Sequence, residues 1–174
     1  MTDDTVSAVV LAAGEGRRLE PLTSRRPKPM VPIANRPILE YVVSAIADAG
    51  IDRIVLVVGY QQERIRNHFG DGDDWGVNIE YVEQEKQLGT AHAVLQAEEA
   101  VSDPFLVLNG DRLVDSSLVQ RVRSEIEAND GPVMAITRTD NASDYGVVTV
   151  SNNQVTELTE KPPEPIASKL INAG

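Results

Sequence analysis

Apolar runs of strand length alternate with segments of helical periodicity through about residue 130. The runs at residues 6–12, 53–58 and 105–109 are almost wholly apolar and rich in valine and leucine, which is typical of parallel strands covered on both faces. Helical segments separate these runs, so parallel strands joined by crossover helices are the simplest arrangement. We therefore expect an α/β fold, a three-layer sandwich around a mostly parallel, Rossmann-like sheet.

The expected elements follow from apolar spacing and from capping and turn residues. Strands are expected at residues 6–12, 53–58, 77–83, 105–109 and 132–139, and helices at residues 37–49, 61–69, 90–101 and 116–128. Asn35 and Asp115 are expected to cap the first and the last of these helices. Residues 151–153 are polar turn formers and predict a late β-hairpin, and residues 169–174 are expected to start a further strand. No linker interrupts the pattern, so residues 1–174 are expected to form a single domain.

Composition excludes several classes of function. The chain has no cysteine, which rules out disulfides, thiolate metal sites and cysteine nucleophiles. No stretch of about 18 apolar residues is present, so no membrane span is expected. Residues 1–5 are acidic and lack the order of a secretion signal, so a cytoplasmic location is expected. The net charge of −11 indicates an ordinary acidic protein or adaptation to high salt, and it argues against general nucleic-acid binding.

Cationic residues gather in one loop in spite of this negative balance. They are Arg17, Arg18, Arg25, Arg26 and Lys28, all shortly after the first expected strand. A local concentration of cations in an acidic chain indicates a phosphate-bearing ligand.

The same loop opens with Gly14 and Gly16. A dinucleotide-binding loop would need a third glycine that opens a helix at once, and a P-loop would need Gly-Lys followed by Ser or Thr; neither pattern is present. Glycine has no Cβ atom, so this backbone could still approach phosphates closely. The alternative is a tight turn whose arginines are only solvated.

Two later segments are expected at the same mouth, because ligands of open α/β sheets sit beyond the carboxyl ends of the strands. Gly89 and Thr90 open a helix after the third strand and offer either free backbone N–H groups or an ordinary cap by Thr90. Asp111 follows the fourth strand and is a natural Mg²⁺ ligand there, unless it only forms a turn. His68 and His92 lack the spacing of a zinc site and are expected to face solvent or pack on helices.

Residues 11–41, LAAGEGRRLEPLTSRRPKPMVPIANRPILEY, resemble the signature of the sugar-1-phosphate nucleotidyltransferases, which include glucose-1-phosphate thymidylyltransferases and uridylyltransferases. The resemblance is specific in its Gly-x-Gly-x-Arg-Leu core, its Pro-Lys-Pro segment and its Asn-Arg-Pro turn, and it runs through the whole chain. It implies transfer of a nucleoside monophosphate from dTTP or UTP to glucose 1-phosphate or N-acetylglucosamine 1-phosphate, which gives an NDP-sugar and pyrophosphate.

The resemblance also implies roles for particular residues. For the nucleotide it implies backbone contacts from Leu11, Ala12, Gly14 and Gly16, and base recognition by Gln84 and Gly89. It further implies that Arg18 and Lys28 contact the phosphates and act in catalysis, and that Asp111 is catalytic and binds Mg²⁺. For the sugar 1-phosphate it implies Gly146, Glu160, Lys161 and Asn172, in the segments DYGVV, LTEKP and INAG. Arg17 stands where the family often has a small hydroxyl residue, which leaves its role open.

The implied chemistry needs little from acid–base groups. A phosphate monoester has a second pKa near about 6, so the attacking phosphate is already ionised at neutral pH. Positioning and charge stabilisation would then carry the catalysis. Two alternatives stay open: a non-catalytic nucleotide- or sugar-phosphate-binding relative, and a cytidylyltransferase for another phosphate acceptor.

Members of the family continue further and carry a second metal-binding aspartate that has no counterpart in this sequence. The chain is therefore expected to be truncated at its C-terminus and to have weak activity or none. The identity of the nucleotide, the identity of the sugar and assembly into a homo-oligomer are all left open by the sequence.

Overall fold

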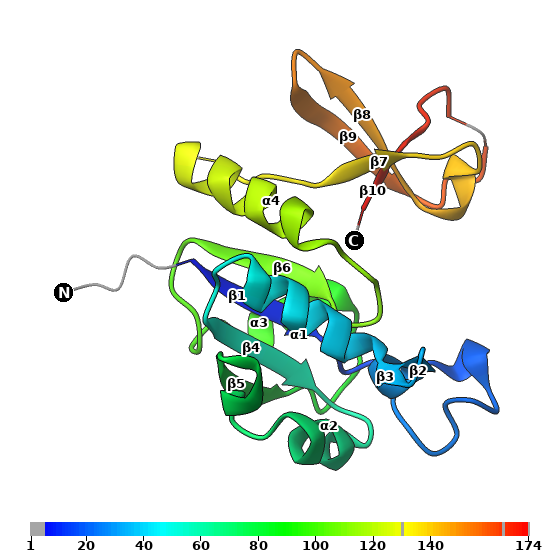
Figure 1. Cartoon of the computed structure of the whole chain (residues 1–174). Helices are drawn as coiled ribbons and strands as arrows, with labels where there is room; N and C mark the ends of the chain where they lie inside the picture. Colours follow the sequence, from blue (N-terminus) through cyan, green and yellow to red (C-terminus); the bar gives the residue numbers. More distant parts are fainter. Residues whose placement is uncertain (1–5, 130, 165, 174) are drawn as a thin grey trace. The chain divides into compact units, whose positions relative to one another are not determined.

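The computed structural model describes residues 6–129, 131–164 and 166–173, apart from the side chain of Arg18 (Figure 1). The acidic residues 1–5 lie outside the described part. The chain forms two compact units, Met1–Glu127 and Ala128–Gly174, and each unit contains a four-stranded sheet of its own. Among the described residues, no helix is long and apolar enough to cross a membrane.

A parallel sheet with the strand order β5-β4-β1-β6 forms the centre of the first unit. Its strands are β1 (Ser7–Leu11), β4 (Arg53–Val58), β5 (Asn78–Glu83) and β6 (Phe105–Asn109). All three strand pairings are parallel. The first four expected strands and the parallel arrangement are therefore confirmed.

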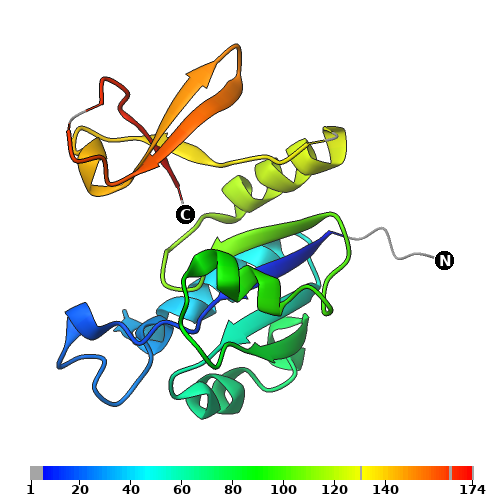
Figure 2. The same ribbon diagram turned by 180° about the vertical axis from the view of Figure 1, so that it is seen from behind.

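Helices cover both faces of this sheet, with α1 in front in Figure 1 and α3 in front in Figure 2. The helices are α1 (Ile38–Asp48), α2 (Gln62–Phe69), α3 (Thr90–Gln96) and α4 (Ser116–Ala128). Alternate residues of a strand point to opposite faces. Val10 and Leu56 share a core with α1, α2 and α4, whereas Val9 and Val57 share a core with α3. The expected three-layer sandwich is confirmed.

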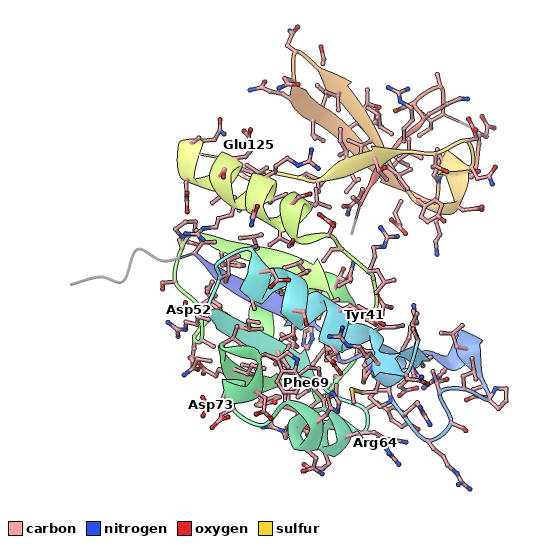
Figure 3. All side chains as sticks on the ribbon, in the orientation of Figure 1. Tyr41, Asp52, Arg64, Phe69, Asp73 and Glu125 are labelled. Carbon is pink, nitrogen blue, oxygen red and sulfur yellow. The ribbon has the colours of Figure 1, made fainter. Side chains whose placement is uncertain are left out.

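An aromatic cluster closes the C-terminal end of α2. Phe69, which is labelled in Figure 3, is buried. Its ring lies edge-on to that of His68, with 4.8 Å between the centroids, and tilted against that of Trp75, with 4.9 Å between the centroids. His68 Nε2 also lies 3.2 Å from Glu40 Oε2 on α1. Burial alone would raise the pKa of Glu40, but hydrogen bonds from Arg36 and His68 outweigh burial and hold that pKa below its ordinary value. His68 thus packs on helices, as expected.

A small hairpin precedes α1. Its strands β2 (Pro32–Ile33) and β3 (Arg36–Pro37) pair antiparallel, and Ala34 and Asn35 between them both have positive φ, 48° and 68°. Two positive φ angles are typical of a two-residue hairpin turn. Pro37 is the residue that precedes the first helical position. The expected cap by Asn35 is wrong, because the turn and β3 separate Asn35 from the helix.

The strand order reverses beside β1. The chain adds β4 and then β5 on one side of β1, and the segment containing α3 carries it back so that β6 pairs on the other side. Where the order reverses, the connections after two neighbouring strands run in opposite directions and leave a crevice at the carboxyl ends of these strands. Ligands of open α/β sheets bind in this crevice. The N–H of Gly110 donates to the carbonyl of Leu11 at 2.9 Å, which ties the ends of β6 and β1 together.

An antiparallel sheet with the order β7-β10-β8-β9 forms the second unit. Its strands are β7 (Ile136–Arg138), β8 (Gly146–Ser151), β9 (Gln154–Glu160) and β10 (Leu170–Asn172). The expected hairpin is confirmed as β8 and β9, with Asn152 and Asn153 at φ 51° and 65° in its turn. The strand expected at residues 132–139 is shorter and belongs to this sheet, because β7 pairs with β10.

Candidate functional site

A cavity of about 300 Å³ opens at the carboxyl end of the parallel sheet, beside the reversal at β1. Its lining consists of Leu11, Ala13, Gly14, Lys28, Pro29, Gln84, Gln87, Gly89, Thr90, Ala93, Asn109 and Asp111. Half of this lining was expected from the sequence: Leu11, Gly14, Lys28, Gln84, Gly89 and Asp111. The segments that follow β1, β5 and β6 therefore meet at one mouth.

An ion pair joins two of these segments. Lys28 lies in the short 3-10 helix η2 (Lys28–Met30), and its Nζ atom lies 2.5 Å from Asp111 Oδ2 after β6. The two side chains remain 36% and 33% exposed. A pair with that much solvent contact stabilises a fold by about 0–1 kcal/mol. The pair therefore contributes little to stability, and it places a cation and a carboxylate in the lining of the cavity.

The loop between β1 and η2 needs glycine at position 16 to hold Lys28 there. Gly16 has φ 72°, in the left-handed region. A Cβ atom on Gly16 would lie 2.7 Å from the Cβ of Lys28 and 3.0 Å from Cγ2 of Thr23. The hydroxyl of Thr23 also donates to the carbonyl of Gly16 at 2.9 Å. Close packing around Gly16 therefore sets where the lysine leaves the backbone.

Gln84 is a buried polar side chain in the wall of the cavity, 5% exposed. Its backbone N–H donates to the carbonyl of Val58 at 2.8 Å and so continues the pairing of β5 with β4. Its Nε2 atom donates to the carbonyl of Gly89 at 3.2 Å and lies 3.0 Å from Nδ1 of His92. The segment after β5 is thus tied to the first turn of α3.

Gln87 lines the cavity although no sequence pattern singled it out. Its Nε2 atom donates to the carbonyl of Ala13 at 2.9 Å, which joins the segment after β5 to the segment after β1. A contact between positions so far apart depends on the fold, so no local signal could have revealed it. Ala93 follows Thr90 by one helical turn, so the helical spacing could have predicted that Ala93 lies on the same side of α3 as Thr90. The other lining residues without a predicted binding role are Ala13, Pro29, Thr90 and Asn109.

Two residues expected to contact the nucleotide, Ala12 and Gly16, are not part of the cavity lining. Ala12 is fully buried, and its N–H donates to the carbonyl of Val57 at 2.8 Å. Arg18 belongs to the 3-10 helix η1 (Arg17–Leu19), and its side chain lies outside the described part of the structure. Nucleotide contacts by these three residues stay predictions.

Three of the four residues expected to hold the sugar 1-phosphate adjoin one another within the second unit. Gly146 and Glu160 are partners across β8 and β9. A Cβ atom on Gly146 would lie 2.9 Å from Glu160 Oε2 and 4.0 Å from the Cβ of Asn172. Lys161 follows at φ 41°, and its N–H donates to the carbonyl of Tyr145 at 3.0 Å. The missing side chain at Gly146 is what leaves room for the carboxylate of Glu160.

The donor groups around Asp111 fit a hard cation that is shared with phosphates. Asp111 and Asn109 both line the cavity and carry carboxylate and amide oxygens, the kind of ligand that Mg²⁺ takes. Across the described residues, no group of three or more His, Asp or Glu side chains could hold a metal ion without help. Mg²⁺ commonly binds through one or two carboxylates together with substrate phosphates, so this lining would fit Mg²⁺ only beside a ligand that carries phosphates.

The doubly wound sheet, the cavity at its reversal and the lysine–carboxylate pair in that cavity define an α/β protein suited to a phosphorylated ligand. Residues 7–174 match the family model described as Nucleotidyl transferase, and the chain belongs to that family. It is 42% identical over 171 residues to the "Bifunctional protein GlmU" of Methanococcus maripaludis, a match covering 97% of this chain and 39% of that protein. The chain thus spans about two fifths of the length of the GlmU relatives that it matches.

A second relative is covered more fully. The chain is 39% identical over 172 residues to the "UTP--glucose-1-phosphate uridylyltransferase AglF" of Haloferax volcanii, a match covering 97% of this chain and 70% of that protein. The fold is shared with a solved structure of UDP-glucose pyrophosphorylase complexed with UDP-glucose, at a TM-score of 0.85 and 24% identity over 98% of this chain and 74% of that one.

Proposed function

We propose that this chain transfers a nucleoside monophosphate from UTP or dTTP to a sugar 1-phosphate, either glucose 1-phosphate or N-acetylglucosamine 1-phosphate. The observation that carries the proposal is that one cavity is lined both by Lys28 with Asp111 and by Gln84 with Gly89. A cation and a carboxylate suit phosphates and their metal ion, and a glutamine suits the edge of a pyrimidine base. The name of the Haloferax volcanii relative puts UTP and glucose 1-phosphate first among the candidates.

The reaction requires control of charge more than it requires acid–base catalysis. An oxygen of the sugar phosphate attacks the α-phosphorus of the nucleotide, the bond to the β-phosphate oxygen breaks, and pyrophosphate leaves with the electron pair. The sugar phosphate is mostly a dianion at neutral pH, with a second pKa of about 6, so no base has to remove a proton. The repulsion between two polyanions is the main obstacle, and fixed positive groups lower it.

Lys28 is the residue of this site best suited to that task. Its pairing with Asp111 holds the ammonium group in the cavity wall before a ligand arrives. We assign Lys28, together with Arg18, to the triphosphate and the departing pyrophosphate. With the ammonium group on the phosphates, the carboxylate of Asp111 would be the residue to hold Mg²⁺. Bound Mg²⁺ would supply charge neutralisation on the phosphates.

The nucleoside end of the ligand is assigned to other residues of the lining. Gln84 and Gly89 would read the base, and the backbone around Leu11 and Gly14 would lie against the nucleotide. Gly14 supports this role, because a Cβ atom on it would meet nothing within 4 Å, so the backbone there is open to a ligand.

The sugar 1-phosphate is assigned to residues of the second unit. Glu160 would accept hydrogen bonds from sugar hydroxyls and Lys161 would hold the sugar phosphate, while Gly146 and Asn172 complete the set. The clustering of Gly146, Glu160 and Asn172 supports this assignment. The family match extends over both units, which supports one nucleotidyltransferase core. A cytoplasmic location is part of this proposal.

Pyrophosphate release tests the proposal directly. The purified chain is given UTP, dTTP, CTP or ATP with each sugar 1-phosphate and Mg²⁺, and release is expected with UTP or dTTP. Lys28→Ala is expected to lower kcat/KM by about 100- to 1,000-fold, as removal of a charge-stabilising donor does, with little change in Tm because the Lys28–Asp111 pair is partly exposed.

Lys169→Ala is the matched control, because Lys169 forms an exposed pair with Asp140 at 2.7 Å and has no role in the proposed chemistry. It should retain activity. Nucleotide binding without pyrophosphate release, both in the folded wild type and in a chain that continues past residue 174, would identify a non-catalytic relative, and release with CTP alone would identify a cytidylyltransferase. Either result contradicts the proposed reaction.

A further inference from the structure

We infer that His92 is a positioning residue for base selection, which orients the amide of Gln84 so that its oxygen faces the cavity and favours uracil or thymine over cytosine. This inference rests on the proposed function and adds a residue to it. The juxtaposition that carries it is the contact of one amide nitrogen, Gln84 Nε2, with both the carbonyl of Gly89 and the ring of His92.

The orientation of the amide follows from the chemistry of its neighbours. A backbone carbonyl can only accept a hydrogen bond, so the group of Gln84 that lies 3.2 Å from the carbonyl of Gly89 must be the donating NH₂. The same nitrogen lies 3.0 Å from Nδ1 of His92. An NH₂ group has two hydrogens, so one is available for each acceptor. His92 then accepts at Nδ1, as a neutral imidazole protonated at Nε2 does.

His92 contributes more to this orientation than Gly89 does. The carbonyl of Gly89 also accepts the N–H of Ala93 at 3.1 Å, which is the first hydrogen bond of α3. It is therefore shared between the helix and Gln84. The imidazole of His92 is half-buried and gives Gln84 the shorter contact of the two. Without it, one amide hydrogen loses its acceptor, and only the shared carbonyl of Gly89 still holds the amide in this orientation.

The oxygen of the amide is left for the ligand. No hydrogen bond from a described residue reaches Oε1 of Gln84. Among the described residues, the fully buried side-chain atoms without a partner include Ser7 Oγ but not Oε1 of Gln84. Gln84 lines the cavity, so Oε1 offers an acceptor there. Uracil and thymine carry an N–H donor at N3, whereas cytosine carries an unprotonated acceptor at that position. Two acceptors facing each other leave a buried group unpaired, which is the strongest form of rejection.

The test compares nucleotide preference in wild type, His92→Leu and His92→Asn. Leucine fills the space and removes the acceptor, whereas asparagine can place Oδ1 near the position of Nδ1. The measured quantity is the ratio of kcat/KM for UTP to that for CTP, with glucose 1-phosphate and Mg²⁺. His92→Leu should lower this ratio at least about tenfold, mainly through a higher KM for UTP, and His92→Asn should keep it within about threefold of wild type. His92→Ala replaces the leucine variant if that variant does not fold.

His68→Leu is the control, since His68 contacts Glu40 rather than the cavity. The inference is overturned if His92→Leu keeps the wild-type ratio, if His92→Asn loses it as fully as leucine does, or if the wild type itself accepts CTP as well as UTP. In all three cases the proposed transfer reaction stands. Absence of nucleotide binding and turnover in the wild type would instead remove the proposed function, and the inference with it. Titration of UTP and CTP binding without sugar phosphate keeps the comparison possible if turnover is slow.

Discussion

Gly146 has no Cβ atom, and the space that a Cβ atom would need lies next to the carboxylate of Glu160. The nearest atom to a Cβ added at Gly146 is Oε2 of Glu160, at 2.9 Å, followed by a side-chain carbon of Leu158 at 3.5 Å. The obstructing atom is the tip of a flexible side chain, so a methyl group at this position would move the carboxylate and leave the backbone in place. A substitution of Gly146 by alanine is therefore expected to affect ligand binding without affecting the stability of the fold.

Gly146→Ala is therefore expected to raise the KM for the sugar 1-phosphate about 10- to 100-fold, the loss of roughly one hydrogen bond to a charged group. Tm should stay close to that of wild type. Initial-rate kinetics with varied sugar 1-phosphate, alongside thermal melts, measures both. Gly131→Ala is the matched control, because a Cβ atom there meets nothing within 4 Å. An unchanged KM in Gly146→Ala would argue against Glu160 as a sugar ligand.

Among the helices, α4 has the clearest N-terminal cap. The backbone N–H of Ser117 donates to Oδ1 of Asp115 at 2.8 Å. Hydrogen bonds from the side chain and then from the backbone of Ser117 hold the pKa of Asp115 below its ordinary value. A carboxyl whose pKa is lower in the folded state stabilises the fold above the unfolded pKa of about 3.9. That stabilisation is lost as the pH falls through the folded pKa.

Asp115→Ala should lower Tm by a few degrees at neutral pH, and its difference from wild type should shrink as the pH falls through the folded pKa of the Asp115 carboxyl. Thermal melts across this range measure the effect. Asp115→Asn supplies the comparison, because asparagine caps nearly as well as aspartate and does not titrate. If the difference between Asp115→Ala and wild type were the same at both ends of the range, the ionised cap would not be its source.

The elements that could be predicted from the sequence are those whose signals are local. The valine-rich run before Leu11 and the Asp115 cap depend on neighbouring residues, and both are confirmed. Asn35 has the side chain of a helix cap, but its backbone serves a turn that only the pairing of β2 with β3 requires. Residues 136–138 look like a strand of the parallel sheet, yet their partner is β10, which comes much later in the chain.

At the scale of the whole molecule, the candidate site depends on the core beneath it. Leu39 at the start of α1 is fully buried, and one of its Cδ atoms would lie 3.1 Å from a Cβ atom on Gly110. It thus packs under the strand end that carries Asp111. Residues such as Lys28 and Asp111 could be found from motifs, but Gln87 could not, because its link to Ala13 exists only once the sheet has formed.

Leu39→Ala should lower the free energy of unfolding by about 2–5 kcal/mol, the usual cost of a cavity left by a buried leucine. Urea denaturation followed by circular dichroism measures the change. Leu95→Ala is the control on α3, where the side chain is 62% exposed, and it should change stability by less than about 0.5 kcal/mol. Equal effects of the two substitutions would contradict the packing described for α1.

The reversal beside β1 has a consequence for the growing polypeptide on the ribosome. Within the parallel sheet, β1 is synthesised before the other strands and β6, its neighbour on the side of the crevice, is synthesised after them. Ser7 of β1 pairs with Phe105 of β6. Synthesis proceeds at about 5–20 residues per second, so several seconds pass between the synthesis of β1 and that of β6. During this time the valines of β1 have no β6 to pair with. A nascent chain that has not yet released Asp111 from the exit tunnel lacks one wall of the cavity. A ligand of this cavity can therefore stabilise the protein only after the whole parallel sheet has emerged.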